Sequence, residues 1–284
     1  MRIAYLGPAG TNTHEALLAA DVGGGQNEHV PLPTIHDCVV AVQRGETERA
    51  FVPIENALEG SVNATLDALA VEAEDVAIVG EALHPIHTCL IARTPIELSA
   101  IERVVSHPHA TAQCAHFLRT RLPQARVVAA SSTAEAVRAV AENEADAGVA
   151  ALGSRLAAER YGCELLAVGV DDAAGNETRF VWLAATPDRA GSIQSGHGPW
   201  KTAVVFWGVG AEAPGWLVRC LSEFASRGVN LTRIESRPRK QGLGRYMFFV
   251  DLEGRADEGP VAEALVALRP HVEHLRVLGS FPAA

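Results

Sequence analysis

Residues 1–185 alternate short apolar, β-branched runs with longer segments in which apolar residues recur every three or four positions. This alternation predicts strands separated by helices, which is the pattern of an α/β domain. The segment 132–143 is typical of the predicted helices, because Ser132 and Glu135 have the spacing of a capping box that precedes an apolar face. The predicted strands are 2–6, 50–54, 76–83, 87–92, 103–106, 126–130, 146–150 and 178–184.

The pattern changes at residues 186–199, which contain Gly, Ser and Pro and no apolar periodicity. These features are typical of a linker. Residues 200–284 then follow the order strand, helix, strand, strand, helix, strand, which is that of a ferredoxin-like βαββαβ module. The sequence therefore predicts an α/β domain over 1–185, a linker over 186–199 and a second α/β domain over 200–284.

Composition narrows the classes of function. The 284 residues carry 24 Lys and Arg against 34 Asp and Glu, a net charge of −10, which disfavours binding to nucleic acid or to an anionic membrane. No apolar run approaches the roughly 18 residues of a membrane span, and the first residues lack the features of a signal peptide. We therefore expect a cytoplasmic protein.

Cofactor and metal motifs are weak. The five cysteines and eleven histidines are scattered without metal-ligand spacing, so we expect no metal site. Gly208 and Gly210 follow a predicted strand as in a dinucleotide fingerprint, with Glu235 further on, but the remaining chain is too short for the two-halved dinucleotide fold. The sequence therefore predicts no cofactor.

Small polar residues follow three predicted strands of the first domain. They occupy residues 7–13, the stretch from Glu55 and Asn56 to Gly60 and Ser61, and residues 106–108. Such junctions direct backbone N–H groups toward the carboxyl edge of a sheet, where an anion such as a carboxylate can bind. No G-K-[ST] follows the glycines, so this is not a phosphate-binding P-loop.

Further candidate chemistry lies at the start of the last strand of this domain. Arg179 offers a planar fork for a carboxylate, and Thr178 offers a hydroxyl that can donate and accept. Glu55 is either a loop organiser or a charge held in a cleft, and the spacing leaves both readings open. A serine triad has weak support, because no G-x-S-x-G occurs.

Several motifs carry a resemblance to a known family. They read GPAGTNTHEA (7–16), VPIENALEGSVNATLDAL (52–69), SHPHATAQC (106–114), STAEAV (132–137) and GNETRF (175–180), and together they resemble prephenate dehydratase. The segment NLTRIESRP (230–238) resembles the C-terminal regulatory ACT domain of that family. The resemblance implies a catalytic domain of two lobes around a cleft, similar to the type 2 periplasmic-binding-protein fold, followed by the ferredoxin-like domain.

The implied reaction converts prephenate to phenylpyruvate, water and carbon dioxide in phenylalanine biosynthesis, without a cofactor. The resemblance assigns the central catalytic role to Thr178, which we expect to donate to the leaving hydroxyl. Arg179 would hold a carboxylate, and Phe180 would help to wall the pocket. The remaining residues implied to position or bind the substrate are Thr11, Glu55, Asn56, Gly60, Ser106 and His107.

The resemblance also implies feedback by L-phenylalanine, bound at an interface between subunits of a homodimer or homotetramer. The implied effector residues are Gly215, Leu217, Asn230, Leu231, Glu235, Ser236, Arg237 and Pro238. The chain departs from the family pattern at Asn12, Ala57, His109 and Trp216, where the family has an aromatic residue, a hydroxyl, a glutamine and an alanine. Trp216 would fill part of the effector pocket, which leaves the strength and sign of regulation open.

Two other functions remain open. Arogenate dehydratase uses the same chemistry on a substrate with an amino-acid side chain, and no residue of the sequence separates the two enzymes. A ligand sensor with an ACT switch would share the two-lobed cleft but would not need Thr178. The intact Thr178-Arg179-Phe180 motif disfavours the non-aromatising prephenate decarboxylases.

Overall fold

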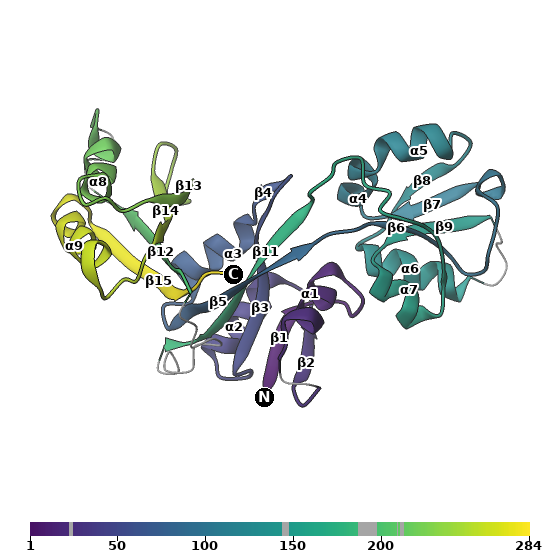
Figure 1. The fold of residues 1–284 in the computed structure, drawn as a ribbon, viewed down its shortest axis with the longest axis horizontal. Helices are drawn as coiled ribbons and strands as arrows, with labels where there is room; N and C mark the ends of the chain where they lie inside the picture. Colours follow the sequence, from purple (N-terminus) through teal and green to yellow (C-terminus); the bar gives the residue numbers. More distant parts are fainter. Residues whose placement is uncertain (23–24, 144–147, 187–197, 209, 211–212) are drawn as a thin grey trace. The chain divides into compact units, whose positions relative to one another are not determined.

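The structure is a computed structural model that describes residues 1–22, 25–143, 148–186, 198–208, 210 and 213–284. Its described part contains three β-sheets with helices between the strands (Figure 1). The predicted α/β class is confirmed.

The first sheet has the strand order β2-β1-β3-β11-β5, with β4 paired to β3. Its strands are β1 (Arg2–Leu6), β2 (Glu28–Leu32), β3 (Arg49–Asn56), β4 (Gly60–Ser61), β5 (Val76–Pro85) and β11 (Glu177–Ala185). The helices between them are α1 (Asn12–Ala20), α2 (Ile35–Gln43) and α3 (Asn63–Asp67), which continues directly into the π-helical turn η1 (Ala68–Glu72). β1 runs parallel to β2, whereas β4 is antiparallel to β3.

The second sheet is mixed and has the order β10-β6-β9-β7-β8. Its strands are β6 (Cys89–Ala92), β7 (Arg103–Ser106), β8 (Arg126–Ala129), β9 (Val149–Gly153) and β10 (Glu164–Val168). Its helices are η2 (Leu98–Ala100), α4 (Pro108–Gln113), α5 (Ala115–Arg121), α6 (Thr133–Glu142) and α7 (Arg155–Tyr161). β7 lies parallel to β8 and β9, and β6 is antiparallel to β9 and β10.

Helices cover both faces of the second sheet. Ile91 and Ala151 pack with Val137 of α6 in one apolar cluster, whereas their neighbours Leu90 and Leu152 pack in another. Successive strand residues point to opposite faces, so one short strand contributes to both clusters. The predicted capping box is present, because the Ser132 hydroxyl accepts the Glu135 N–H at 3.0 Å and α6 begins at the next residue.

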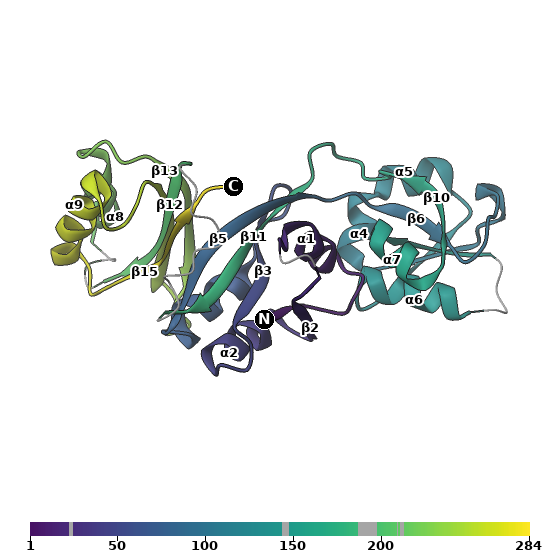
Figure 2. The ribbon, with the colours of Figure 1, turned by 60° about the horizontal axis from the view of Figure 1, so that its bottom comes forward.

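The third sheet is antiparallel and has the order β13-β14-β12-β15. Its elements follow the order β12 (Trp200–Trp207), α8 (Trp216–Ala225), β13 (Leu231–Pro238), β14 (Tyr246–Glu253), α9 (Gly259–Leu268), η4 (Arg269–His271) and β15 (His274–Pro282). Both long helices lie on one face of the sheet (Figure 2) and share a core with it. The predicted βαββαβ order is confirmed.

The chain forms two compact units. The first comprises Met1–Cys38, Phe51–Val62 and Leu83–Phe180, and the second comprises Val39–Ala50, Asn63–Ala82 and Val181–Ala284. The second sheet belongs to the first unit, whereas the third sheet belongs to the second unit together with α3 and η1. The domain boundaries drawn from the sequence stay a prediction, and 187–197 of the expected linker lie outside the described residues.

Candidate active site

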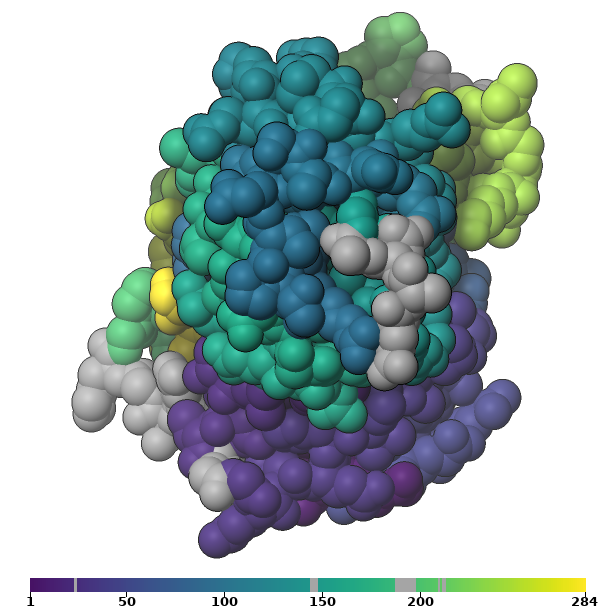
Figure 3. All heavy atoms as spheres, turned by 90° about the vertical axis from the view of Figure 1, so that its right-hand side faces the viewer, coloured from purple at the N-terminus to yellow at the C-terminus, as the bar shows by residue number. Residues whose placement is uncertain are grey.

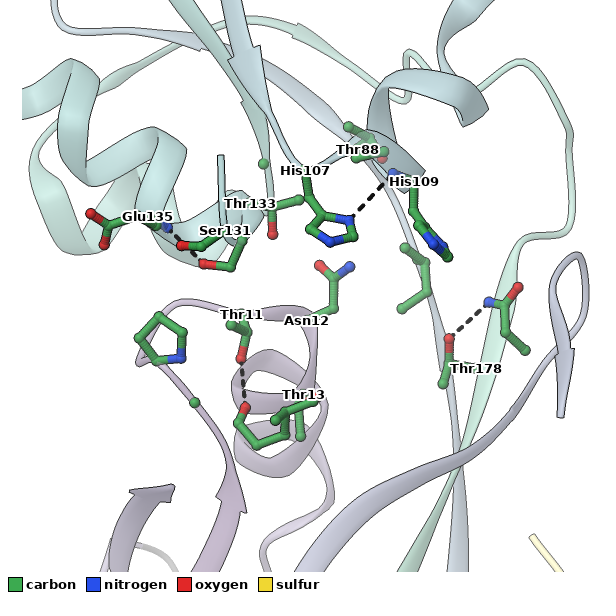
Figure 4. Close-up of a pocket in the computed structure, with 18 of the residues that line it drawn as sticks. Thr11, Asn12, Thr13, Thr88, His107, His109, Ser131, Thr133, Glu135 and Thr178 are labelled. Atoms are coloured by element: carbon green, nitrogen blue, oxygen red, sulfur yellow. Dashed lines mark hydrogen bonds between the residues drawn. The ribbon is translucent and has the colours of Figure 1, made fainter. Parts of the chain in front are cut away.

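The first unit contains a cavity of about 860 Å³. This volume is in the range of small-molecule sites. Its wall comes from the loops that follow β1, β3 and β7, from the start of α6 and from the start of β11. The polar lining residues are Thr11, Asn12, Thr13, Asn56, Glu59, Thr88, His107, His109, Gln113, Ser131, Ser132, Thr133, Glu135, Asn176 and Thr178. Ten of them, from Thr11 to Thr178, are labelled in Figure 4.

The β1–α1 loop is held from both sides. Thr11 caps α1: its hydroxyl accepts the His14 N–H at 3.3 Å and donates to the Leu6 carbonyl at 3.1 Å. His14 Nδ1 accepts the Gly10 N–H at 3.1 Å, and the Ser154 hydroxyl donates to the Gly10 carbonyl at 2.9 Å. Atoms of the N-terminal segment therefore pack against those of the second sheet and its helices (Figure 3).

The protonation state of His14 suits this arrangement. Burial, followed by the nearby His29 and Arg160, lowers the pKa of His14 to about 4. The ring is therefore neutral near pH 7, and its Nδ1 can accept a hydrogen bond only while unprotonated. Gly10 itself has φ of +92°, a conformation that favours glycine, and an added Cβ would lie 3.4 Å from the Cα of Ala157.

Thr178 lies at the start of β11 and is 8% exposed. Asn56 Nδ2 donates to Thr178 Oγ1 at 2.9 Å and to Asn176 Oδ1 at 2.8 Å. The Asn56 side-chain oxygen accepts the backbone N–H groups of Leu58 and Glu59, so the amide can present only its NH₂ group to Thr178. Because the Thr178 oxygen already accepts, its own proton is available to a ligand in the cavity.

Two histidines face the same space at the start of α4 (Figure 4). His107 Nδ1 accepts the backbone N–H of His109 at 3.3 Å. Burial and then the neighbouring His109 lower the pKa of His107, which favours the neutral ring. A neutral ring that accepts at Nδ1 carries its proton at Nε2, so His107 is a donor. His109 Nδ1 lies 3.4 Å from Glu59 Oε2.

The cavity wall has few charges. Among the described lining residues, the ionisable groups are two carboxylates, Glu59 and Glu135, and the two histidines, with no lysine or arginine. The described residues also hold no cluster of three metal-ligating side chains.

No helix in the described part of the chain is long and apolar enough to cross a membrane.

The structure places four of the sequence-predicted residues in the lining, namely Thr11, Asn56, His107 and Thr178. Arg179 points to the opposite side of β11 from Thr178, because neighbouring strand residues alternate, and its Nε lies 3.2 Å from Glu55 Oε2. Phe180 is buried and stacks on Phe51, with ring centroids 5.0 Å apart. Glu55, Arg179 and Phe180 are therefore not among the residues that line the cavity.

Ser106 and Gly60 also lie outside the lining. The Ser106 hydroxyl is fully buried and donates to the Leu152 carbonyl at 2.8 Å, which links β7 to β9. Gly60 begins β4 with φ of +80°, and an added Cβ there would meet no atom within 4 Å. Its positive φ, together with this open space, indicates that the turn conformation requires the glycine.

Sequence reasoning missed several lining residues. Asn176 and Gln113 stand inside the quoted motifs GNETRF and SHPHATAQC, so their motifs could have indicated them. Thr88 had no such signal: it reaches the cavity because Asp171 accepts both its hydroxyl and its N–H, at 2.6 and 2.7 Å. These partners are 83 positions apart in the sequence, which places their contact beyond local sequence patterns.

The predicted effector residues lie in the second unit. Gly215 precedes α8 with φ of +79°, and β13 carries Glu235 to Pro238 at the edge of the third sheet. Arg237 pairs with Asp67 of α3, with Nη2 3.0 Å from Oδ2. Trp216 is 4% exposed and packs in the core, where its indole N–H donates to the His271 carbonyl at 2.8 Å.

Leu217 and Leu231 pack at the margin of this same core. Asn230 precedes β13, and its carbonyl accepts the Glu253 N–H at 3.0 Å. The eight predicted effector residues therefore fall into two segments of the third-sheet domain, the start of α8 and the segment 230–238 that contains β13.

Comparison with known proteins gives one consistent family. The prephenate dehydratase family matches residues 3–188, and the ACT domain family matches residues 210–270. Prephenate dehydratase from Amycolatopsis methanolica is 43% identical over 283 residues, covering 100% of this chain and 89% of that protein.

Solved structures agree in fold. The crystal structure of prephenate dehydratase from Arthrobacter aurescens in complex with L-Phe is 39% identical, with a TM-score of 0.88, and covers 99% of this chain and 90% of that one. GqqA, described as a novel type of quorum-quenching acylase, is 30% identical, with a TM-score of 0.85, and covers 100% of this chain and 98% of that one. The resemblance drawn from the motifs is thereby confirmed: the chain belongs to the prephenate dehydratase family, hydro-lyases of phenylalanine biosynthesis, and carries a C-terminal ACT domain.

Proposed function

We propose that this chain converts prephenate to phenylpyruvate, water and carbon dioxide in the cavity of the first unit. The observation that carries the proposal is the hydrogen bond from Asn56 to the Thr178 oxygen, which leaves the Thr178 proton directed to a ligand. A leaving hydroxyl needs such a donor, because hydroxide is a poor leaving group.

The reaction breaks two bonds of the substrate ring. The bond to the ring carboxyl breaks and releases carbon dioxide, its electron pair enters the ring, and the C–O bond to the ring hydroxyl breaks as the ring becomes aromatic. The departing oxygen takes a proton and leaves as water. Thr178 donates to that oxygen as negative charge develops on it, and solvent restores the proton.

The remaining wall binds and orients the substrate. His107 supplies a neutral donor at the cavity surface, and an oriented donor binds a carboxylate without a formal positive charge. The donor protons of Thr11 and Asn56 are already engaged within the protein, so we assign these two residues to holding the β1–α1 loop and Thr178 in position. We assign Glu55, Arg179, Phe180, Ser106 and Gly60 to support of this wall from behind. The Arg179–Glu55 pair holds β11 beside β3, which keeps Thr178 within reach of Asn56.

We further propose that L-phenylalanine binds the C-terminal domain and regulates the enzyme. The complex of the Arthrobacter aurescens relative with L-Phe and the match to the ACT family support this assignment. The candidate residues remain Gly215, Leu217, Asn230, Leu231 and the segment from Glu235 to Pro238. Trp216 belongs to the core, so its indole shapes this region from beneath.

We also propose a homodimer or homotetramer in the cytoplasm. β13 lies at an edge of the third sheet, and an edge strand offers unpaired main-chain groups to a second copy. Sedimentation of the purified protein with and without phenylalanine tests this assembly: a monomer under both conditions contradicts it.

The test of function is formation of phenylpyruvate from prephenate by the purified chain, followed by its absorbance in alkali. Product that falls when phenylalanine is added supports both parts of the proposal, whereas unaffected product contradicts regulation alone. No product from prephenate, with product from arogenate, identifies the alternative substrate. No product from either contradicts the proposed reaction.

The acylase described for one relative has less support here. Nucleophilic hydrolysis needs a hydroxyl or thiol hydrogen-bonded to a base. Among the described lining residues, Thr11 and Ser132 bond to backbone groups and Thr178 accepts from Asn56, while Thr88 donates to the carboxylate of Asp171. No hydrogen bond in this described lining joins a hydroxyl to a histidine ring. Assay of the same preparation for acylase activity tests this alternative.

A further inference from the structure

Two parts of the cavity wall come from segments that are far apart in the chain. One is the β1–α1 loop, which lines the cavity with residues 7–9 and 11–13. The other belongs to the elements of the second sheet and comprises residues 131–133, Glu135 and Gly153. Figure 4 shows Thr11 near Ser131, with Thr178 on the other side of the same space. A substrate that fills this space touches both parts, so their spacing affects how tightly it binds.

On the side of Thr178, the backbone itself connects the two sheets. β5 leads through residues 86–88 into β6, and residues 169–176 lead from β10 back into β11. These two connections bond to each other. The Ile86 N–H donates to the Asn176 carbonyl at 2.8 Å, and the Val170 N–H donates to the Thr88 carbonyl at 3.0 Å. The spacing of the wall on this side is therefore fixed by main-chain structure.

On the side of the β1–α1 loop, side chains of the segment around α7 make the connection. The Ser154 hydroxyl donates to the Gly10 carbonyl at 2.9 Å, and the Tyr161 hydroxyl donates to the Ala9 carbonyl at 3.5 Å. We call these two bonds the α7 clasp. The Ser154 bond is buried and has ordinary length, whereas the Tyr161 bond is long for a hydroxyl donor. Ser154 therefore provides most of the clasp.

The other side-chain bonds of the loop do not replace the clasp. The Thr11 hydroxyl bonds to Leu6 and to the His14 N–H, and the His14 ring accepts the Gly10 N–H. All four residues belong to the segment 6–14. These bonds keep the internal shape of the loop, but they do not hold it against α7.

Glu15 of α1 makes a separate contact with α7. Its carboxylate interacts with the backbone N–H of Leu156. A change at Ser154 leaves this contact in place, so α1 should stay docked when the loop that precedes it is released. Loss of the Ser154 bond should therefore change the cavity without unfolding the unit.

The Ser154 hydroxyl has a single proton and two tasks. It accepts the Ala157 N–H at 3.1 Å, which caps α7, and it gives its proton to Gly10. Gly153 lines the cavity directly before Ser154, and the residues on either side of Gly10 line it as well. A movement at this bond therefore shifts lining residues of both parts of the wall.

We propose that Ser154 is a positioning residue for substrate binding: its bond to Gly10 holds the β1–α1 loop against α7 and thereby sets the width of the cavity. This inference rests on the proposed function and deepens it. Ser154 does not line the cavity, so it acts through the loop and not by contact with the substrate. Thr178 and Asn56 lie on the side that the backbone fixes, so the effect should fall on binding and not on the bond-breaking step.

The test compares Ser154→Ala with Ser154→Gly. Both variants remove the donor to Gly10, but Gly is a much better N-cap residue than Ala, so Ser154→Gly should unfold at a urea concentration closer to that of the wild type. We expect both variants to raise KM for prephenate about fivefold, the typical net effect of one hydrogen bond, with kcat within about twofold. The matched control is Thr120→Ala, which removes a hydroxyl that donates to the His116 carbonyl at 2.8 Å in α5, and should keep the wild-type KM.

The two variants separate positioning from helix capping. Equal rises in KM with unequal losses of stability support the proposal. A KM that rises in Ser154→Ala alone would assign the effect to the cap of α7 and overturn the proposal. A wild-type KM in both variants, or a loss confined to kcat, would overturn it as well.

Hydrogen exchange followed by mass spectrometry gives a readout that needs no activity. The Ser154 hydroxyl accepts no N–H of the segment 6–14, so exchange there should change only if the loop depends on the clasp. We expect exchange in this segment to be at least about threefold faster in both Ser154 variants and unchanged in Thr120→Ala. Wild-type exchange in the Ser154 variants overturns the proposal. If the wild type converts neither prephenate nor arogenate, the proposed function fails, and the exchange experiment still decides whether Ser154 holds the loop.

Discussion

In the cavity of the first unit, the polar groups are hydroxyls, amides and imidazoles, with two carboxylates. In the second unit, the third sheet meets residues 63–81 through arginine and lysine. Arg276 of β15 donates to the carbonyls of Leu69, Ala73 and Val76 at 2.6 to 2.8 Å, at the end of the π-helical turn η1. Lys201 Nζ lies 2.7 Å from Glu81, whose side chain is fully buried.

This contrast shows two uses of polar groups. A guanidinium that satisfies several buried carbonyls fixes one sheet against one helix, because each unmade bond would leave a buried polar group unsatisfied. The cavity instead presents neutral donors whose direction is fixed by their neighbours, which stabilises charge only where it develops. The contact between the third sheet and residues 63–81 depends on charged side chains, whereas the candidate chemistry in the cavity depends on the orientation of neutral donors.

The largest effect should come from Thr178→Ala, which removes a neutral donor from the cavity. Loss of the donor to the leaving hydroxyl should lower kcat at least about 100-fold, the lower range for a general acid. Phenylpyruvate formation measures it, and Thr178→Ser, which keeps the hydroxyl, should retain much of the activity. Near-normal turnover in Thr178→Ala would show that Thr178 is not the donor.

The second prediction tests the contact between the third sheet and residues 63–81. Arg276→Leu leaves three carbonyls near the end of η1 without this donor, and we expect the free energy of unfolding to fall by about 2 to 4 kcal/mol. Urea unfolding of the full chain measures the loss. Arg255→Leu removes an arginine that packs over Trp200 at 4.3 Å and serves as the control, with no clear change expected. Equal effects in both variants would contradict the role of Arg276.

The third prediction concerns how the free energy of unfolding depends on pH. Burial lowers the pKa of His14 to about 4 in the folded chain. The unfolded chain therefore binds this proton more readily, and protonation of His14 favours unfolding once the pH falls below the ordinary pKa of histidine. Stability from this group is complete above about pH 6.5 and should decline by roughly 2 to 3 kcal/mol as the pH falls toward 4. Urea midpoints at pH 7 and pH 5 should differ less in His14→Gln than in the wild type. Equal slopes would contradict the prediction.

The smallest effect should come from Asp67→Asn. Burial alone would raise the pKa of Asp67, but the hydrogen bonds and charges of Arg237 and Lys240 outweigh it and hold the pKa below its ordinary value. The stabilisation is therefore present above the usual aspartate range and lost as the pH falls through the lowered value.

For Asp67→Asn we expect a loss of about 1 kcal/mol at pH 7, measured by urea unfolding, and a weaker response to phenylalanine, because Arg237 stands in β13. Arg44 and Glu46 form an exposed pair in the same unit, so Glu46→Gln is the matched control. An unchanged midpoint together with an unchanged phenylalanine response would contradict the coupling.

The sequence predicted the buried strands and the main helices, because their signals are local. The apolar runs gave β1, β3, β5, β6, β7 and β11, and the Ser132 capping box gave α6. It missed β2 and β10, which are edge strands of their sheets with mostly half-exposed residues, and β2 includes Pro31. An edge position alone does not hide a strand, because the apolar runs at residues 76–83 and 126–130 predicted the edge strands β5 and β8.

The site was predicted only in part because its hydrogen bonds join residues that are far apart in the sequence. Motifs indicated Thr178 and Asn56. The Asn56 bond to Thr178, the Ser154 bond to Gly10 and the Gln113 bond to Glu59, however, link residues 54 to 144 positions apart. Whether a residue stands in a wall or behind it depends on strand alternation and pairing, which placed Arg179 beside Glu55. The π-helical turn η1 also had no sequence signal.

The scarcity of positive charge in the cavity wall affects how the substrate arrives. The chain carries a net charge of −10, so a doubly negative substrate is repelled on average before it reaches the wall. Added salt weakens that repulsion over the screening distance, about 10 Å at 0.1 M, and association should become faster as ionic strength rises. Enzymes that attract an anion with a positive field show the reverse. Selection of the substrate in this protein therefore takes place after the encounter, at the range of individual hydrogen bonds.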